Sequence, residues 1–193
     1  MKVMTIYGTR PEFVRLCLIL RKLDKVVDHV TVHTGQNYDD SLNAVFFREL
    51  DIRPPDEHLA ASGTFAEQAA TIFVGVEQAI RKHRPDRFLV LGDTNSSLGA
   101  VVAKRMGVPV FHLEAGNRCY DESVPEEVNR RIIDHCTDVH LPYTQRSAGH
   151  LIREGIPSSR VLVVGNPICE VMRRYRGSIR SSDIVTRLGL PRH

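Results

Sequence analysis

Residues 2–23 read KVMTIYGTRPEFVRLCLILRKL and show the pattern of one strand followed by one helix. A short apolar run over 3–7 stops at Gly8, and apolar residues then recur at helical spacing over 12–23. Glycine permits a tight turn, and Pro11 suits the first turn of a helix because the N–H that it lacks would have no partner there. The stretch therefore predicts a buried strand, a tight turn and a helix.

The same alternation continues along the chain. Further apolar runs, rich in valine, isoleucine and leucine, lie at 30–34, 88–91, 108–113, 139–142 and 161–164. Stretches with helical spacing lie at 41–50, 64–82, 96–106, 125–136 and 144–154. Strands that are apolar at nearly every position are typical of a sheet covered on both faces, and strand–helix alternation favours parallel pairing through right-handed crossovers. We predict an α/β fold with a doubly wound, Rossmann-like parallel sheet.

Two segments depart from this alternation. The stretch over 51–63 is the longest irregular one, and either a functional lid or a tolerated surface insertion explains it. After residue 167 the pattern weakens into a charged helix with no strand behind it. We therefore predict a domain over 1–165 and an interdomain segment over 166–193, which leads toward a carboxyl-terminal domain that the sequence does not include.

Composition excludes several classes of protein. Of the 193 residues 42% are hydrophobic and 25% are charged, and no stretch has the roughly 20 apolar residues that cross a bilayer. The first residues lack the long apolar core of a signal peptide, so we expect a cytoplasmic protein without a membrane partner. The net charge of +3 is scattered apart from a basic cluster at 173–180, which we interpret as a solvated face. Nucleic acid is therefore not an expected partner.

Cysteine and histidine spacing gives no sign of a metal site or a disulfide framework. The four cysteines lie far apart without a CxxC pair, and we interpret them as reduced thiols. The nine histidines show no HxH or HExxH spacing. The turn after the first apolar run is not a GxGxxG fingerprint, so a nicotinamide cofactor gains no support.

Polar residues follow the expected strands, at the edge of the sheet where doubly wound proteins bind ligands. Arg10, in the turn after the first apolar run, offers a fixed charge for phosphate near a helix amino terminus. Asp93 and Glu114 come directly after two later runs. Taken alone, each of these residues is equally an ordinary turn or capping residue.

A third acid, Glu126, lies in the first turn of the helix expected at 125–136, with Arg130 one turn later. Acidic residues are common in a first turn because they complement the helix dipole. Three carboxylates near an anion-binding helix end, however, suit the removal and return of a proton beside a charged leaving group. That combination predicts an enzyme that acts on a nucleotide sugar.

The ordered motifs GTRPE, HTGQN, LGDTNS, HLEAGNR, VPEEVNRR and GNP resemble those of the non-hydrolysing UDP-N-acetylglucosamine 2-epimerases. The resemblance covers nearly the whole chain. It implies two Rossmann-like domains in the GT-B arrangement, a UDP-sugar bound between them, and neither a metal nor a redox cofactor. It also implies that the sugar C2 proton is removed, that UDP leaves by anti elimination to give 2-acetamidoglucal, and that UDP adds back with reprotonation on the opposite face.

Motif positions carry the family's residue roles onto this sequence. Arg10 and Arg130 are similar to substrate or phosphate contacts. Arg15 stands where the family commonly has lysine, which keeps the charge but changes its geometry, and we predict that it also binds substrate. The carboxylates that resemble the family's proton-transfer residues, with acid and base not distinguished, are Asp93, Glu114 and Glu126.

Two departures from the motifs bear on the ligand. Asn37 replaces a histidine that the family often has after Gln36, and Asn117 replaces the leucine of EAGLR. These variants resemble the branch that acts on UDP-2-acetamido-2,6-dideoxy-hexoses in capsule and O-antigen synthesis, which is an alternative substrate class. Gln36 is a candidate residue of the regulatory UDP-N-acetylglucosamine site that some bacterial members have.

The resemblance also bears on what the chain does alone. In the family, the carboxyl-terminal half carries the uridine-binding residues and a further histidine near the diphosphate. We therefore expect this chain alone to bind UDP weakly with negligible epimerase activity, and we expect the full-length protein to form a homodimer. A GT-B glycosyltransferase and a non-catalytic nucleotide-sugar-binding half-protein are the alternatives from other classes.

Overall fold

The structure is a computed structural model that describes residues 1–35 and 46–190. In this part of the chain a six-stranded parallel sheet has the strand order β3-β2-β1-β4-β5-β6. The order runs outward from β1 in both directions, as in doubly wound sheets, and confirms the predicted fold class. The strands are β1 (Lys2–Tyr7), β2 (Asp28–His33), β3 (Glu57–His58), β4 (Arg87–Leu91), β5 (Val110–Leu113) and β6 (Val139–Leu141).

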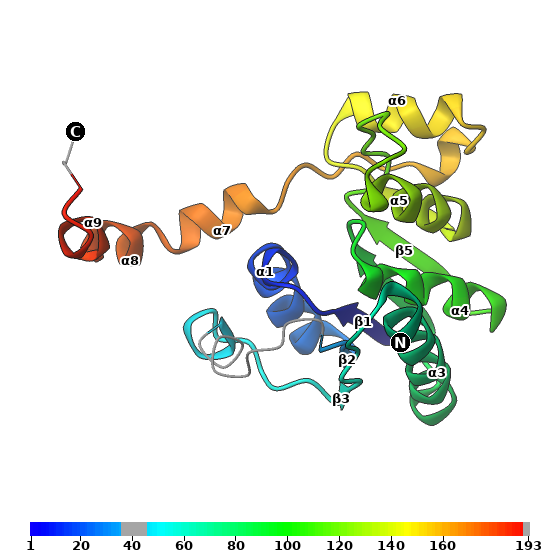
Figure 1. Cartoon of the computed structure of the whole chain (residues 1–193), viewed down its shortest axis with the longest axis horizontal. Helices are drawn as coiled ribbons and strands as arrows, with labels where there is room; N and C mark the ends of the chain where they lie inside the picture. Colours follow the sequence, from blue (N-terminus) through cyan, green and yellow to red (C-terminus); the bar gives the residue numbers. More distant parts are fainter. Residues whose placement is uncertain (36–45, 191–193) are drawn as a thin grey trace.

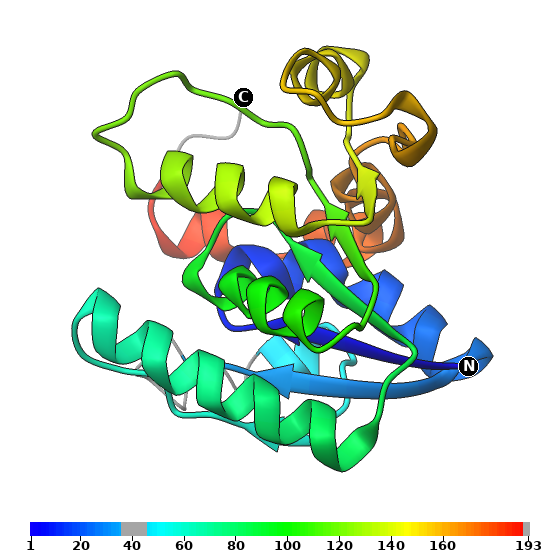
Figure 2. The ribbon, with the colours of Figure 1, turned by 90° about the vertical axis from the view of Figure 1, so that its right-hand side faces the viewer.

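Helices cover both faces of the sheet (Figures 1 and 2). On one face α3, α4 and α5 lie side by side, whereas α1 covers the other face and α7 packs against α1. A 3-10 turn at Asn95–Leu98 leads into α4, so the single helix expected over 96–106 has two parts. The described α-helices are α1 (Arg10–Val26), α3 (Phe65–His83), α4 (Gly99–Arg105), α5 (Pro125–Cys136), α6 (Gln145–Arg153), α7 (Ile168–Arg174), α8 (Arg176–Ser181) and α9 (Ile184–Arg187).

Alternate residues of the central strands enter opposite cores. In β1, Met4 and Ile6 are buried in the cluster that includes α3 and α4, whereas Val3 and Tyr7 are buried in the cluster that includes α1. Successive side chains of a strand point to opposite faces, and both faces of this sheet are covered. The apolar runs are therefore nearly continuous because neither face of a central strand meets water.

The last expected strand, over 161–164, is not a full strand of the sheet. Val161 forms an isolated parallel bridge with His140, and the N–H of Leu162 donates to the carbonyl of His140 at 2.9 Å. Leu162, Val163 and Val164 are exposed. This apolar run therefore lies in an extended conformation beside β6 without the burial that its composition suggested.

The irregular stretch contains a short strand, and two other expectations fall wholly or partly outside the described residues. Within the irregular stretch over 51–63, Glu57–His58 form β3, which pairs with β2 and makes an edge strand that two residues could not signal in the sequence. The helix expected over 41–50 lies largely outside the described residues, although 46–49 are helical. Gln36, the candidate regulatory residue, also lies outside the described residues.

Glu12 joins the turn after β1 to the turn after β4. Its Oε2 accepts hydrogen bonds from the N–H of Gly8 at 3.0 Å and from the N–H and hydroxyl of Thr9 at 2.7 and 2.8 Å. Its Oε1 accepts from the Thr94 hydroxyl at 3.1 Å. Complete burial outweighs these hydrogen bonds and raises the pKa of Glu12 to about 7. A titratable carboxyl thus fixes the two turns at the centre of the sheet.

The raised pKa predicts a pH dependence of stability. Between pH 4.5 and 7 the folded state holds a proton on Glu12 that the unfolded state has released, so stability falls as pH rises through this window. In Glu12→Gln this site does not titrate. We expect the free energy of unfolding of the natural chain to fall by about 3 kcal/mol relative to the variant across the window, as measured by urea unfolding. Parallel pH profiles of the two proteins contradict this.

Gly116 lets the loop after β5 pass close under α6. Its φ of +78° is a conformation that favours glycine, and a Cβ placed there lies only 2.3 Å from the carbonyl oxygen of Ser147. Gly107 has the same φ of +78° but has no atom within 4 Å of an added Cβ. The two glycines therefore share their backbone conformation but differ in the room that is available for an added side chain.

This pair separates backbone strain from steric overlap. We expect Gly107→Ala to cost about 1 kcal/mol of unfolding free energy, and Gly116→Ala to cost about 1–3 kcal/mol more because the backbone of α6 must move. Urea unfolding of both variants measures the difference. Equal losses in the two variants would show that α6 does not pack closely over this loop.

Candidate active site

Asp93 lies just beyond the carboxyl end of β4 and is held by a guanidinium from α5. Arg130 donates from Nε and Nη2 to Oδ2 of Asp93 at 3.0 and 2.6 Å. The Asn129 side chain donates to the Asp93 carbonyl at 3.0 Å. The helix that begins at Pro125 therefore positions both the backbone and the carboxylate of Asp93.

Glu114 lies beyond the carboxyl end of β5, next to the turn that holds Asp93. Its Oε2 forms an ion pair with Nη1 of Arg15 from α1, and its Oε1 accepts from the Asn117 amide at 3.1 Å. Burial raises the pKa of Glu114, Arg15 opposes the rise, and Asp93 adds to it. The φ of Glu114 is +69°, a strained conformation for a residue with a side chain.

The two carboxylates belong to one site because their turns touch. A Cβ added to Gly92, the residue before Asp93, lies 3.5 Å from Oε2 of Glu114. The site thus contains two carboxylates and two guanidinium groups from four elements that are far apart in the sequence. Of the candidate residues predicted from the sequence, the structure brings together Asp93, Glu114, Arg15 and Arg130.

Glu126 and Arg10 are placed differently. Glu126 is exposed on the first turn of α5, and its neighbour Glu127 is the buried acid. Arg10 is exposed at the first residue of α1, and its side chain makes no hydrogen bond or ion pair within the described part of the chain. Both residues are exposed in the first turn of a helix.

Glu127 supports the site from within the protein. Its carboxylate accepts from Nη1 of Arg130 at 2.7 Å and from the N–H of Cys119 at 3.0 Å. Although its burial acts in the opposite direction, these hydrogen bonds and a further one from Arg131 lower the pKa of Glu127 to about 2. An anionic Glu127 therefore holds Arg130 against Asp93. Sequence reasoning missed Glu127, because two adjacent acids in a first turn look alike until the helix is packed.

A buried carboxylate, that of Asp134, fixes the loop that contains Glu114. Its Oδ1 lies 2.8 Å from Nδ1 of His112, and its Oδ2 lies 2.8 Å from Nη1 of Arg118 and 3.1 Å from the N–H of Gly116. Nε2 of His112 in turn lies 2.8 Å from the carbonyl of Gly92. Burial acts to raise the pKa of Asp134, but His112 and Arg118 outweigh it and keep that pKa below its ordinary value. This network ties the end of β5 to the end of β4.

A surface hollow opens beside the Arg15–Glu114 pair. Ile19 lines it from α1, one helical turn after Arg15, and Leu113 lines it just before Glu114. Residues 164–167 and the side chains of Cys169, Glu170 and Arg173 complete the wall. Arg15 and Glu114 themselves are not among the residues that line it.

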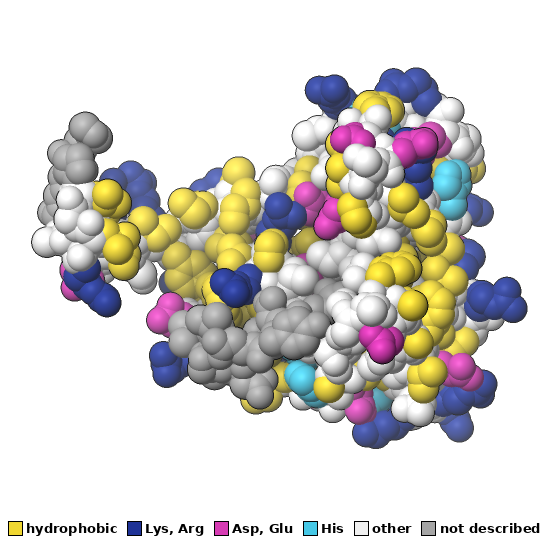
Figure 3. All heavy atoms as spheres, in the orientation of Figure 1, with side chains coloured by type: hydrophobic (Ala, Val, Ile, Leu, Met, Phe, Trp, Pro, Cys, Tyr) yellow, Lys and Arg dark blue, Asp and Glu magenta, His cyan; other side chains and the backbone are white. Residues whose placement is uncertain are grey.

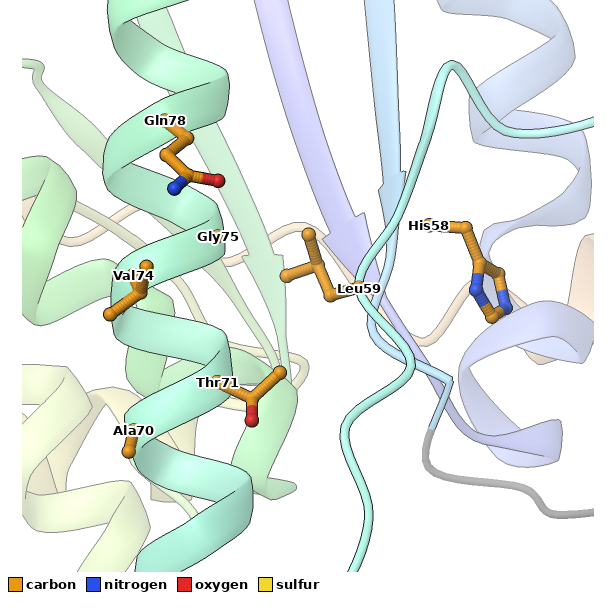
Figure 4. A pocket seen from close by; sticks show the side chains of 7 residues that line it. All are labelled: His58, Leu59, Ala70, Thr71, Val74, Gly75 and Gln78. Atoms are coloured by element: carbon orange, nitrogen blue, oxygen red, sulfur yellow. The ribbon is translucent and has the colours of Figure 1, made fainter.

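A second hollow, between α3 and the segment that follows β3, lies away from these charges. Figure 4 shows Leu59 pointing toward Gly75 and Thr71 of α3, while His58 points away from that helix. None of the candidate site residues lines this hollow. Among the described residues no three histidine, cysteine, aspartate or glutamate side chains gather as they would around a metal ion, and no described helix has the length and apolar character to span a membrane.

Comparisons with known proteins identify a family. Residues 21–189 match the family described as UDP-N-acetylglucosamine 2-epimerase. A UDP-N-acetylglucosamine 2-epimerase of Methanocaldococcus jannaschii is 39% identical over 173 residues, which are 88% of this chain and 47% of that protein. A UDP-2,3-diacetamido-2,3-dideoxy-D-glucuronate 2-epimerase of Pseudomonas aeruginosa is 34% identical over 168 residues, 85% of this chain and 48% of that protein.

Solved structures show the same relationship. The UDP-N-acetylglucosamine 2-epimerase of Rickettsia bellii superposes with a TM-score of 0.92 at 46% identity, over 99% of this chain and 52% of that one. The M. jannaschii enzyme in complex with UDP-GlcNAc and UDP superposes with a TM-score of 0.91 at 36% identity, over 97% of this chain and 53% of that one. A galactosyltransferase with 13% identity and a TM-score of 0.60 shares the fold alone.

The chain thus spans about half the length of the relatives it matches, as the amino-terminal half of a two-domain GT-B-type fold does. The family match covers most of the chain. The ordered motifs, the strand order and the superpositions agree with one another. The chain belongs to the UDP-N-acetylglucosamine 2-epimerase family.

Proposed function

We propose that this chain is the amino-terminal half of an enzyme that interconverts UDP-N-acetylglucosamine and UDP-N-acetylmannosamine. One observation carries the proposal: Asp93 and Glu114 leave neighbouring strands at the ligand-binding edge of the sheet, each paired with a guanidinium. Carboxylates suit proton transfer at sugar C2, and cations at the same edge suit a diphosphate leaving group. The M. jannaschii structure with UDP-GlcNAc and UDP supports a UDP-sugar as the ligand of this half.

The geometry suggests how the groups divide the reaction. One carboxylate takes the C2 proton while the C1–O bond to UDP breaks, and the electron pair of the C–H bond forms the C1–C2 double bond of 2-acetamidoglucal. Return of UDP to C1 and of a proton to the other face of C2 completes the epimerisation. Burial raises the pKa of Glu114, so this carboxyl is suited to hold a proton, and Asp93 and Glu126 are the further proton-transfer candidates.

The basic residues suit the diphosphate. Arg10 is exposed at the amino terminus of α1, where the dipole of this 17-residue helix favours an anion. Arg15 and Arg130 already face carboxylates and can share their remaining N–H groups with a ligand. We propose all three as substrate contacts.

The identity of the sugar is a separate question. The P. aeruginosa relative acts, by its name, on a UDP-2,3-diacetamido-2,3-dideoxy-D-glucuronate, so similar chains serve different sugars that share a 2-acetamido group. We propose UDP-N-acetylglucosamine as the substrate and retain a UDP-2-acetamido-2,6-dideoxy-hexose as the alternative. A competition assay with both sugar nucleotides decides between them.

The end of the chain supports a division into a domain over 1–165 and an interdomain segment over 166–193. In Figure 1 the segment with α7, α8 and α9 extends away from the sheet. Its first part packs on the domain through buried Val171 and through the Tyr175 hydroxyl, which donates to the Leu50 carbonyl at 3.1 Å. Hydrophobic side chains gather along the rest (Figure 3), and those that are exposed include Met172, Ile179, Ile184, Leu188 and Leu190. We propose that this face contacts a carboxyl-terminal half.

Complementation tests the proposed function. We expect the purified chain alone to convert no measurable UDP-N-acetylglucosamine, and its fusion to the carboxyl-terminal half of the M. jannaschii relative to form the manno epimer. In D2O the product carries deuterium at C2, seen by proton NMR. In the fusion we expect Glu114→Gln to slow turnover by about 10²–10⁴-fold while UDP binding persists.

A matched control and the contrary outcomes sharpen this test. Glu122→Gln removes an exposed carboxylate from the same loop region and should leave turnover unchanged. Robust conversion by the chain alone contradicts its assignment as a half enzyme. Sugar transfer to an acceptor without C2 exchange favours a glycosyltransferase, and UDP binding that no fusion converts into turnover favours a non-catalytic binding protein.

A further inference from the structure

Tyr143 has a buried hydroxyl just beyond the carboxyl end of β6. It is the second residue after β6, and the N–H of Glu114 donates to the carbonyl of Leu141 at 3.1 Å, so the ends of β5 and β6 lie together. Only 9% of Tyr143 is exposed. Its hydroxyl is buried and makes no hydrogen bond within the described part of the chain. A buried hydroxyl without a hydrogen bond lowers the stability of the folded protein, so its presence here calls for an explanation.

The surroundings of the phenol point to Glu114. Burial raises the pKa of Tyr143, the negative charge of Glu114 raises it further, and Arg15 acts in the opposite direction. The phenol therefore keeps its proton and acts as a donor. The acceptor that we consider is the carboxylate of Glu114, whose backbone N–H is hydrogen-bonded to the last residue of β6.

Each carboxylate oxygen of Glu114 has one partner in this structure. Oε2 pairs with Arg15 and Oε1 accepts from Asn117, whose own amide oxygen accepts from the Ser147 hydroxyl at 3.1 Å. Asn117 is held on both sides, whereas the Arg15 side chain is 32% exposed and reaches in from another helix. Arg15 is therefore the partner that an anionic ligand can draw away, which leaves Oε2 without its cationic partner.

We propose that Tyr143 is a positioning residue for Glu114, whose hydroxyl donates to the carboxylate when Arg15 turns from it toward the diphosphate of the ligand. This role rests on the proposed epimerase function. The hydroxyl keeps the carboxylate oriented and compensates part of its charge while Glu114 exchanges a proton with the sugar. Tyr143 acts through Glu114 and does not itself touch the reacting carbon.

The charged and titratable groups around Glu114 define the test. Arg15 faces it from α1, Asp93 from the end of β4, His112 from β5 and Tyr143 from the end of β6. Removal of Arg15 imitates the liganded arrangement and leaves the other groups in place. A hydroxyl that donates to the carboxylate then favours the ionised form of Glu114.

The experiment is a carboxyl titration of the whole 193-residue chain by carbon NMR with labelled glutamate, in which Glu114→Gln assigns the resonance. We expect Arg15→Met/Tyr143→Phe to titrate at Glu114 about 1 pH unit higher than Arg15→Met, as loss of a hydrogen bond to a charged group predicts. If the Glu114 titration midpoints of the two proteins lie within about 0.3 pH unit of each other, the proposal is overturned, because so small a difference in free energy requires no hydrogen bond.

Two controls keep the result specific. Arg15→Met/Tyr120→Phe removes the hydroxyl of an exposed tyrosine in the loop after β5 and should titrate like Arg15→Met. Thermal unfolding checks that each variant is folded; Tyr143→Phe removes no hydrogen bond seen in the structure and should not lower the midpoint. Because the titration requires no turnover, it reports on the Tyr143–Glu114 contact even if the complementation assay fails.

Discussion

The buried carboxylate of Asp134 is the constraint on which the site depends. It is fixed between His112 and Arg118, and it accepts the N–H of Gly116. A buried charge with several hydrogen-bonded partners is costly to break, because removal of any one partner leaves another unpaired. Through His112 the network also reaches the Gly92 carbonyl, so the turns that contain Asp93 and Glu114 cannot move independently.

Ion pairs next to this network place positive charge where an anion could bind. The carboxylates of Asp93 and Glu114 each pair with a guanidinium. Glu127 forms a second ion pair with the guanidinium of Arg130. Fixed charges of both signs at one edge cost little reorganisation when charge develops in a reaction. The exposed apolar side chains along α7 to α9 are those that we propose to contact a carboxyl-terminal half.

The sequence predicted the parts of this structure that depend on local pattern. Strand and helix periodicity sufficed for the doubly wound sheet, and strand ends sufficed to place Asp93 and Glu114 at one edge. The sequence did not reveal that Glu127 is buried while Glu126 is exposed, because the rotation of α5 about its axis is set by packing on the sheet. Asn117 was noted only as a departure from a motif, and its hydrogen bond to Glu114 was not predicted. Tyr143 was not predicted because its electrostatic interaction with Glu114 joins separate loops. The run over 161–164 was misread because composition does not reveal whether a face is covered.

We propose that a UDP-sugar binds across the carboxyl ends of β1, β4 and β5. The most direct test of this proposal is an amide NMR titration of the labelled 193-residue chain with UDP-N-acetylglucosamine, which detects weak binding. We predict shift changes concentrated at Gly8 to Arg10, at Gly92 and Asp93, and at Glu114 to Asn117. Changes confined to the hollow on α3, or no saturable change at millimolar ligand, contradict the account.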